Sequence, residues 1–227
     1  MLGIDLLCLD LDGTLVDSRR DIQCALTAAF ATVPTDDLDE RDTEQRYVEH
    51  GGLGRSLREI FEAARPQRGE ALAHRFMDAY VAFYAEHGLA HTRPFPGVEA
   101  TLVALQPLRR EGLRIAIATT KRTLTATRVC EGLGLDRYLD VIVGSESLPP
   151  KPAPDVLLRC ASLMGADPAR GIMIGDMPGD ILAGRAAGMR TGAVTTGVAS
   201  RDELLRHEPD WILSRFEELL AIVHAQP

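Results

Sequence analysis

The sequence predicts an α/β protein whose doubly wound, mostly parallel sheet is interrupted by an inserted all-helical domain. Three observations lead to this fold class. Residues 4–9 form an apolar run, residues 17–93 show helical patterns without a strand pattern, and from residue 94 onward short apolar strands alternate with helices. We therefore assign residues 1–16 and 94–227 to an α/β core and residues 17–93 to a helical insert.

The first strand is predicted at residues 4–9. This run is apolar apart from Asp5, which is typical of a strand buried on both faces of a parallel sheet. It ends in a polar turn at residues 10–14, where the sequence reads Asp-Leu-Asp-Gly-Thr. The turn therefore places two carboxylates directly after a buried strand.

Within the insert, apolar residues recur at helical spacing in three segments. They predict helices at residues 18–32, 53–64 and 69–87. Residues 34–46 are acidic and lack an apolar stripe, so we expect a loop there with a short helix near Glu40.

The second part of the core shows the alternation most clearly. We predict strands at residues 113–118, 141–143, 171–175, 191–194 and 211–213, and helices at residues 97–110, 121–133, 152–164, 178–187, 201–206 and 216–224. Pro107 is expected to end the first of these helices early, and Pro152 to begin the third, because proline is tolerated only in the first turn of a helix.

The composition excludes several classes of protein. A net charge of −8 argues against nucleic acid or an anionic membrane as the main partner. No run reaches the roughly 20 apolar residues that span a bilayer, and the first residues lack the pattern of a signal peptide. We therefore expect a cytoplasmic protein, either a monomer or a homodimer.

Polar residues gather where the predicted parallel strands end. Ligands of open α/β sheets bind at the carboxyl ends of the strands, so these residues should converge. Carboxylates that lie close together need a cation, and Mg²⁺ is the usual one beside phosphate. The residues concerned are Asp10, Asp12, Gly13, Thr14, Thr119, Thr120, Lys121, Lys151, Asp176 and Asp180.

Lysine is rare in this chain, which uses arginine almost throughout. Of 25 basic residues only Lys121 and Lys151 are lysines, and both fall in this set. A lysine kept in such a chain is a candidate for a role that needs a compact ammonium and not a planar guanidinium. Both lysines are therefore candidates for the site. Whether Lys121 contacts a phosphate or faces solvent stays open from the sequence.

Four segments in this order resemble the motifs of the haloacid dehalogenase superfamily of phosphohydrolases. Residues 10–18 resemble its first motif, and Thr119 closes a strand as in the second. Residues 151–155 resemble the third motif and residues 175–180 the fourth. The segments 180–188 and 197–220, together with a helical insert between the first two motifs, are similar to the phosphoglycolate phosphatase branch.

The resemblance implies an α-helical cap on a Rossmann-like core and assigns roles to the clustered residues. Asp10 is the expected nucleophile, which forms an aspartyl-phosphate, and Asp12 the general acid and base. Mg²⁺ is expected on Asp10, Asp176 and the backbone carbonyl of Asp12. Phosphate is expected on Gly13, Thr119, Thr120 and Lys151, although this branch often has asparagine at the position of Thr120. Asp180 should orient Lys151 or metal-bound water.

In the cap, a glycine-rich turn at residues 51–55 is expected to meet the substrate. Gly52 and Gly54 would let the backbone approach a ligand, and Arg55 would bind a carboxylate or a second phosphate. The resemblance thus implies a Mg²⁺-dependent hydrolase of a small phosphorylated metabolite, with 2-phosphoglycolate as the best candidate.

Several alternatives stay open or are disfavoured. A phosphomutase of the β-phosphoglucomutase type shares nearly every motif, and pyrophosphate, sugar phosphates and nucleotides are also possible substrates. A haloacid dehalogenase needs no metal, and the pair Asp10 and Asp12 together with Asp176 argues against it. A phosphonoacetaldehyde hydrolase needs a lysine in the cap, and residues 17–93 contain none. A phospho-accepting signalling module would lack the cap and carry its aspartate after a later strand.

Overall fold

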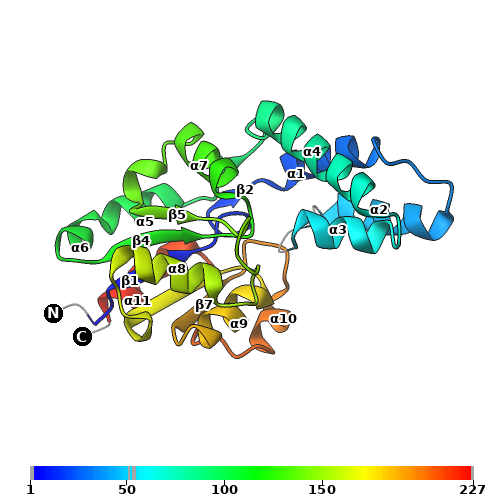
Figure 1. Cartoon of the computed structure of the whole chain (residues 1–227). Helices are drawn as coiled ribbons and strands as arrows, with labels where there is room; N and C mark the ends of the chain where they lie inside the picture. Colours follow the sequence, from blue (N-terminus) through cyan, green and yellow to red (C-terminus); the bar gives the residue numbers. More distant parts are fainter. Residues whose placement is uncertain (1–2, 51, 53–54, 226–227) are drawn as a thin grey trace. The chain divides into compact units, whose positions relative to one another are not determined.

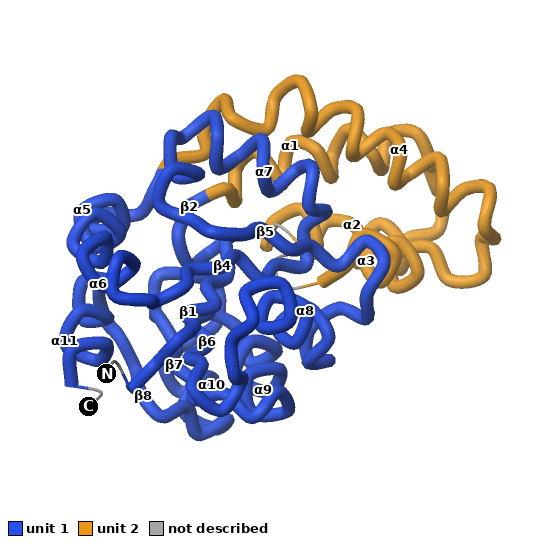
Figure 2. Tube along the Cα trace, turned by 60° about the vertical axis from the view of Figure 1, so that its left-hand side comes forward, with its two compact units in different colours: residues 1–17, 94–227 blue, residues 18–93 orange. Residues whose placement is uncertain are grey.

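The computed structural model describes residues 3–50, 52 and 55–225. The chain divides into two compact units, and Figure 2 distinguishes them by colour. Unit 1 comprises Met1–Asp17 and Pro94–Pro227, and unit 2 comprises Ser18–Arg93. Among the described residues, no helix combines the length and the apolar character needed to cross a membrane.

Unit 1 contains a six-stranded parallel sheet, which confirms the predicted fold class (Figure 1). Its strands are β1 (Leu6–Leu9), β4 (Arg114–Ala118), β5 (Val141–Val143), β6 (Gly171–Gly175), β7 (Arg190–Val194) and β8 (Trp211–Leu213). They run in the order β5-β4-β1-β6-β7-β8, so the first strand of the chain lies inside the sheet. Leu6 pairs with Arg114 on one side and with Gly171 on the other.

Strand β1 is buried completely, as its unbroken apolar run predicts. Leu6 and Cys8 point to one face, where they pack with apolar residues of helices α8 (Asp155–Met164) and α9 (Pro178–Ala186). The remaining helices of unit 1 are α5 (Val98–Ala104), α6 (Gln106–Arg110), α7 (Thr123–Gly132), α10 (Arg201–Leu205) and α11 (Leu219–His224).

Several helix boundaries in unit 1 differ from the prediction. Helix α7 begins at Thr123 and not at residue 121, and a 3₁₀ turn at Phe216–Glu218 precedes α11 in the last predicted helix. The helix expected at residues 97–110 is divided at Leu105 into α5 and α6, and Pro107 lies at the start of α6, where proline is tolerated. Helix α8 begins at Asp155 and not at Pro152. Pro154 disfavours the helical conformation of the residue before it, which explains why the helix does not begin earlier.

Unit 2 is helical. It consists of α1 (Arg19–Phe30), α2 (Leu38–His50), α3 (Leu57–Ala64) and α4 (Glu70–His87). The expected helix near Glu40 is present, but the prediction that residues 34–46 are mostly loop was wrong, because most of this run belongs to α2. Helix α2 buries only Glu40, so it has no apolar stripe for sequence analysis to detect.

Ionic contacts attach α2 to the rest of unit 2. Glu40 pairs with Arg68 at 3.0 Å, and the buried Arg65 pairs with Glu44 of the same helix. The Arg65 guanidinium also lies over the ring of Phe30, 5.1 Å from its centroid. Such distant charge pairing carries no local sequence signal.

The chain enters and leaves unit 2 through two short paired strands, β2 (Val16–Asp17) and β3 (Arg93–Pro94). Within the first turn of α1, the buried carboxylate of Asp21 joins the two ends of unit 2. It accepts hydrogen bonds from the backbone N–H and hydroxyl of Thr92, both at 2.7 Å, and from the His91 ring nitrogen at 2.8 Å. Asp21 therefore attaches the start of α1 to the segment that follows α4.

We expect Asp21→Asn to lower the free energy of unfolding by about 2–3 kcal/mol at pH 7, since it removes charge-assisted hydrogen bonds from a buried site. Burial would raise the pKa of Asp21, but the bonds from Thr92 and His91 outweigh it and lower the pKa. Because the folded pKa lies below the unfolded value, this stabilisation is present above a pH of about 4 and is lost as pH falls through the folded pKa.

Urea unfolding of the wild type and of Asp21→Asn, at pH 7 and in steps down to pH 3, measures this effect. The difference between the two proteins should shrink as the solution becomes more acidic. The exposed Asp42 on α2 provides the control variant Asp42→Asn, which should match the wild type throughout. A difference that is constant with pH would contradict the role of the Asp21 charge.

Candidate active site

The candidate site lies at the topological switch point of the sheet. From β1 the chain continues to β4 and β5 on one side, and later to β6 on the other. In open α/β sheets, the crevice that results at the carboxyl ends of the strands is where ligands bind. Asp10 directly follows β1, Thr119 follows β4 and Asp176 follows β6, so residues far apart in sequence meet at one edge.

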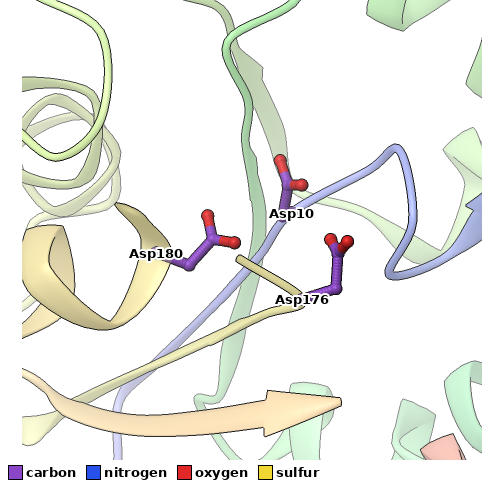
Figure 3. A group of neighbouring side chains, drawn as sticks. All are labelled: Asp10, Asp176 and Asp180. Atoms are coloured by element: carbon purple, nitrogen blue, oxygen red, sulfur yellow. The ribbon is translucent and has the colours of Figure 1, made fainter. Parts of the chain in front are cut away.

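Three carboxylates form a buried cluster at this edge. In the part of the chain that the structure describes, Asp10, Asp176 and Asp180 offer oxygen atoms that all lie within 4.8 Å of one another (Figure 3). Their exposed fractions are only 7%, 0% and 2%. Since like charges at this separation repel strongly, the cluster requires cations or protons to be stable.

Lys151 supplies one of these cations. Its ammonium donates hydrogen bonds to Asp10 Oδ1 at 2.8 Å, to Asp180 Oδ1 at 2.5 Å and to the carbonyl of Ala118 at 3.0 Å. Three acceptors match the three N–H groups of an ammonium. Burial alone would lower the pKa of Lys151, but Asp10 and Asp180 outweigh it and raise the pKa above its ordinary value.

The carboxylates are correspondingly hard to ionise together. Burial raises the pKa of Asp10 to about 7, with Lys151 opposing the rise and Asp180 reinforcing it. Burial, followed by repulsion from Asp10 and Asp180, raises the pKa of Asp176. One ammonium among three carboxylates leaves excess negative charge, and an all-oxygen donor set of this kind fits a hard divalent cation such as Mg²⁺.

The Asp176 carboxylate is held by groups from two loops. The buried hydroxyl of Thr14 donates to its Oδ1 at 2.9 Å, and the backbone N–H of Val198 donates to its Oδ2 at 3.4 Å. A Cβ atom at Gly13 would lie 2.3 Å from Asp176 Oδ2, and one at Gly197 only 1.7 Å from it. Both glycines are therefore required for the close approach of the backbone to this carboxylate.

Sequence reasoning placed Thr14 among the converging residues but gave it no role, and it did not assign Gly197 and Val198 to the site. Thr14 lies in the Asp-Leu-Asp-Gly-Thr turn, so its position was a usable signal. Gly197 and Val198 follow β7 and act through the absence of a side chain and through a backbone N–H, neither of which is visible in a list of chemically active residue types.

The expected phosphate-binding residues follow β4 and β1. Thr119 is buried, and its hydroxyl oxygen accepts a hydrogen bond from the backbone N–H of Lys121 at 3.1 Å, which leaves the hydroxyl hydrogen to donate. The carbonyl of Thr120 accepts from the Ser145 hydroxyl at 2.8 Å. Gly13 lies against Asp176, as described above, with a φ of +87° that favours glycine.

Asp12 and Lys121 form a second ion pair beside the cluster. Lys121 Nζ lies 3.0 Å from Asp12 Oδ2, with side-chain exposures of 9% and 13%. The Asp12 carboxylate is not part of the group formed by Asp10, Asp176 and Asp180. Lys121 thus contacts a carboxylate of the turn after β1, a contact that the sequence did not predict.

The residues expected to contact substrate from the insert belong to unit 2. Gly52 has a φ of +54°, and its carbonyl accepts a hydrogen bond from the backbone N–H of Arg55 at 3.3 Å. Arg55 is exposed. Gly54 lies outside the described residues.

Comparison with known proteins assigns this architecture to a class of hydrolases. The profile of the haloacid dehalogenase-like hydrolases matches residues 7–194, a range that contains Asp10, Lys151 and Asp176. The chain belongs to the haloacid dehalogenase-like hydrolase family, and the resemblance drawn from its motifs is confirmed.

Similar proteins include several phosphatases. A phosphoglycolate phosphatase of Neisseria meningitidis serogroup A is 34% identical over 217 residues, covering 92% of this chain and 89% of the relative. The pyrophosphatase PpaX of Halalkalibacterium halodurans is 31% identical, covering 97% of each chain. Among solved structures, a haloacid dehalogenase-like hydrolase from Streptococcus pneumoniae superimposes with a TM-score of 0.79 at 28% identity, covering 97% of this chain and 98% of its own.

Proposed function

We propose that the protein is a Mg²⁺-dependent phosphomonoesterase that hydrolyses a small organic phosphate, with 2-phosphoglycolate as the best candidate, through an aspartyl-phosphate on Asp10. One observation carries the proposal. The Asp10 carboxylate lies at the switch point of the sheet, 2.8 Å from the Lys151 ammonium and beside Asp176. This arrangement presents a carboxylate oxygen next to the positive charge that a phosphoryl group needs.

The reaction divides into two displacements. In the first, an Asp10 oxygen attacks phosphorus, the ester O–P bond breaks, and the leaving alkoxide takes a proton from Asp12. In the second, Asp12 removes a proton from a water molecule as the water oxygen attacks phosphorus, which releases inorganic phosphate and restores the Asp10 carboxylate. Asp12 therefore returns to its starting protonation state at the end of each cycle.

The remaining residues hold the phosphoryl group and balance its charge. We propose that the hydroxyl of Thr119 and backbone N–H groups near Thr120 and Gly13 donate to phosphoryl oxygens, and that Lys151 offsets the charge of those oxygens. Asp10, Asp176 and the backbone carbonyl of Asp12 would hold Mg²⁺, which would neutralise phosphoryl oxygens during the displacement. Asp180 keeps the Lys151 ammonium in place through their 2.5 Å contact.

We expect Mg²⁺ to stabilise the folded protein as well as to activate it, because a bound cation relieves repulsion among Asp10, Asp176 and Asp180. Thermal unfolding after treatment with EDTA should show a lower Tm, and Mg²⁺ should restore both the Tm and phosphate release. Asp167→Asn, in the turn before β6, is a control that should respond to Mg²⁺ as the wild type does. Full release of phosphate in chelator would contradict the metal requirement.

The substrate is tested with a panel of phosphorylated compounds. The panel should contain 2-phosphoglycolate, pyrophosphate, sugar phosphates and nucleoside monophosphates, and kcat/KM is compared across it. The similarity to pyrophosphatase PpaX makes pyrophosphate the second candidate. A mutase of the β-phosphoglucomutase type would instead turn over a sugar monophosphate only after a sugar bisphosphate is added.

Arg55 is proposed to select the substrate, through an ion pair with its second anionic group. We expect Arg55→Ala to lower kcat/KM for 2-phosphoglycolate by about 10- to 100-fold, the effect of losing a charge-assisted contact of roughly 1.5–3 kcal/mol. Hydrolysis of p-nitrophenyl phosphate, which has no second anion, should change much less. The control is Arg75→Ala, which removes another exposed arginine of unit 2. Equal losses on both substrates would contradict a role in selection.

A further inference from the structure

The ion pair between Lys121 and Asp12 lies beside the site, and the proposed roles give Lys121 no part in the reaction. Its atoms lie 3.0 Å apart, and both side chains are largely withdrawn from solvent. Burying two charges costs free energy unless their geometry is well matched, so such a pair implies a definite relative position of the two groups. The pair connects the turn after β1 with the turn after β4.

The turn that carries Lys121 is itself firmly held. The backbone N–H of Lys121 donates to Thr119 Oγ1 at 3.1 Å, and the Ser145 hydroxyl donates to the carbonyl of Thr120 at 2.8 Å. At Gly144, a Cβ atom would lie 2.3 Å from the carbonyl oxygen of Lys121, so the two loops are in close contact there. The base of the Lys121 side chain is therefore a fixed point against which Asp12 can be held.

We propose that Lys121 is a positioning residue that holds the Asp12 carboxylate where it exchanges protons with the leaving group and with water. The proposal rests on the proposed function of Asp12. It differs from the alternative that Lys121 binds the phosphoryl group directly. In that case, loss of Lys121 would slow the reaction of every phosphate ester. Loss of a residue that positions Asp12 would slow only the steps in which a proton moves.

The two roles differ in how the rate depends on the leaving group. The p-nitrophenolate ion departs without a proton, whereas the alkoxide of an alkyl phosphate requires one. Lys121→Ala should therefore slow phosphoenzyme formation from an alkyl phosphate by about 10- to 100-fold, the scale of a misplaced catalytic group. The burst of p-nitrophenolate release, which reports phosphoenzyme formation from p-nitrophenyl phosphate, should change by less than about threefold.

Rapid-quench measurements on Mg²⁺-loaded wild type, Lys121→Ala and Lys121→Gln give these rates, and the second variant retains most of the side chain if the first fails to fold. The adjacent Arg122 is exposed, and Arg122→Ala is the matched control that should leave both rates unchanged. Equal losses with both substrates would overturn the proposal in favour of phosphate binding. Unchanged rates with both would overturn it in favour of a contact without a catalytic role.

A double-mutant cycle gives an independent test. If Lys121 acts only through Asp12, adding Lys121→Ala to Asp12→Asn should cause no further loss with the alkyl phosphate, whereas independent roles would give multiplied losses and overturn the proposal. The proposed function fails in a different way, since it requires the wild type to form a phosphoenzyme on Asp10. A wild type without that adduct would refute the function whatever the Lys121 variants show.

Discussion

Asp10→Asn is expected to abolish phosphoenzyme formation and to lower kcat by about ten-thousandfold or more, the loss typical of removing a nucleophile. An amide oxygen is a far weaker nucleophile than a carboxylate oxygen, and the substitution also removes a negative charge beside Lys151. Intact mass measurement of acid-quenched reactions should show a phosphate adduct on the wild type, and peptide mapping should place it on Asp10. An adduct on any other residue would refute the assignment.

Asp12→Asn separates the two neighbouring carboxylates. This variant keeps the nucleophile but cannot pass a proton, so with p-nitrophenyl phosphate it should form the adduct and then break it down slowly. The aspartyl-phosphate should therefore accumulate in Asp12→Asn and be absent in Asp10→Asn. The same result in both variants would mean that the two carboxylates do not have separate roles.

Lys151→Ala is expected to lower kcat by about 100- to 1000-fold, the loss seen when one preorganised charge-stabilising donor is removed. Lys151→Arg should lose nearly as much, because a planar guanidinium cannot reproduce the contacts with Asp10, Asp180 and the Ala118 carbonyl at a position whose lysine side chain is only 5% exposed. Steady-state kinetics with p-nitrophenyl phosphate measures both losses. Near wild-type turnover in Lys151→Arg would show that any cation suffices at this position.

Lys151→Ala should also lower the free energy of unfolding, because it leaves buried carboxylates without their cation. Removing one partner of a buried pair typically costs about 3–5 kcal/mol, and protonation of the carboxylates or binding of Mg²⁺ should recover part of this loss. Chemical unfolding of Lys151→Ala with and without Mg²⁺ measures both effects. Arg159→Ala, which changes an exposed residue of α8, is the control and should alter neither activity nor stability.

The elements that could be predicted from the sequence are those whose burial follows a local period. Strand β1 is buried on both faces and reads as an unbroken apolar run, and the predicted core strands are all present in the sheet. Helix α2 could not be predicted in the same way, since Arg65 and Arg68 hold it through charges from distant positions. The paired strands β2 and β3 are too short to show any period.

The site shows the same division. That Asp10, Lys151 and Asp176 lie together could be predicted, because each is a chemically distinctive residue at the end of a strand or in a recognisable motif. The support of Asp176 by Gly197 and Val198 was not, because it depends on a backbone N–H and on space that becomes visible only once β7 is placed beside β6. The pairing of Lys121 with Asp12 likewise depends on β4 lying next to β1.

The paired strands β2 and β3 have a consequence for how such a protein can diverge. Their pairing brings the two points at which unit 2 interrupts the core next to each other in space. The register of β1 against β4 is held by their own pairing, starting at Leu6 and Arg114, and not by the length of chain between them. Insertion between two closely spaced points of a domain is the kind that folded domains tolerate. The segment between Ser18 and Arg93 can therefore be lengthened, shortened or exchanged over evolutionary time while the carboxylates at the sheet edge keep their places.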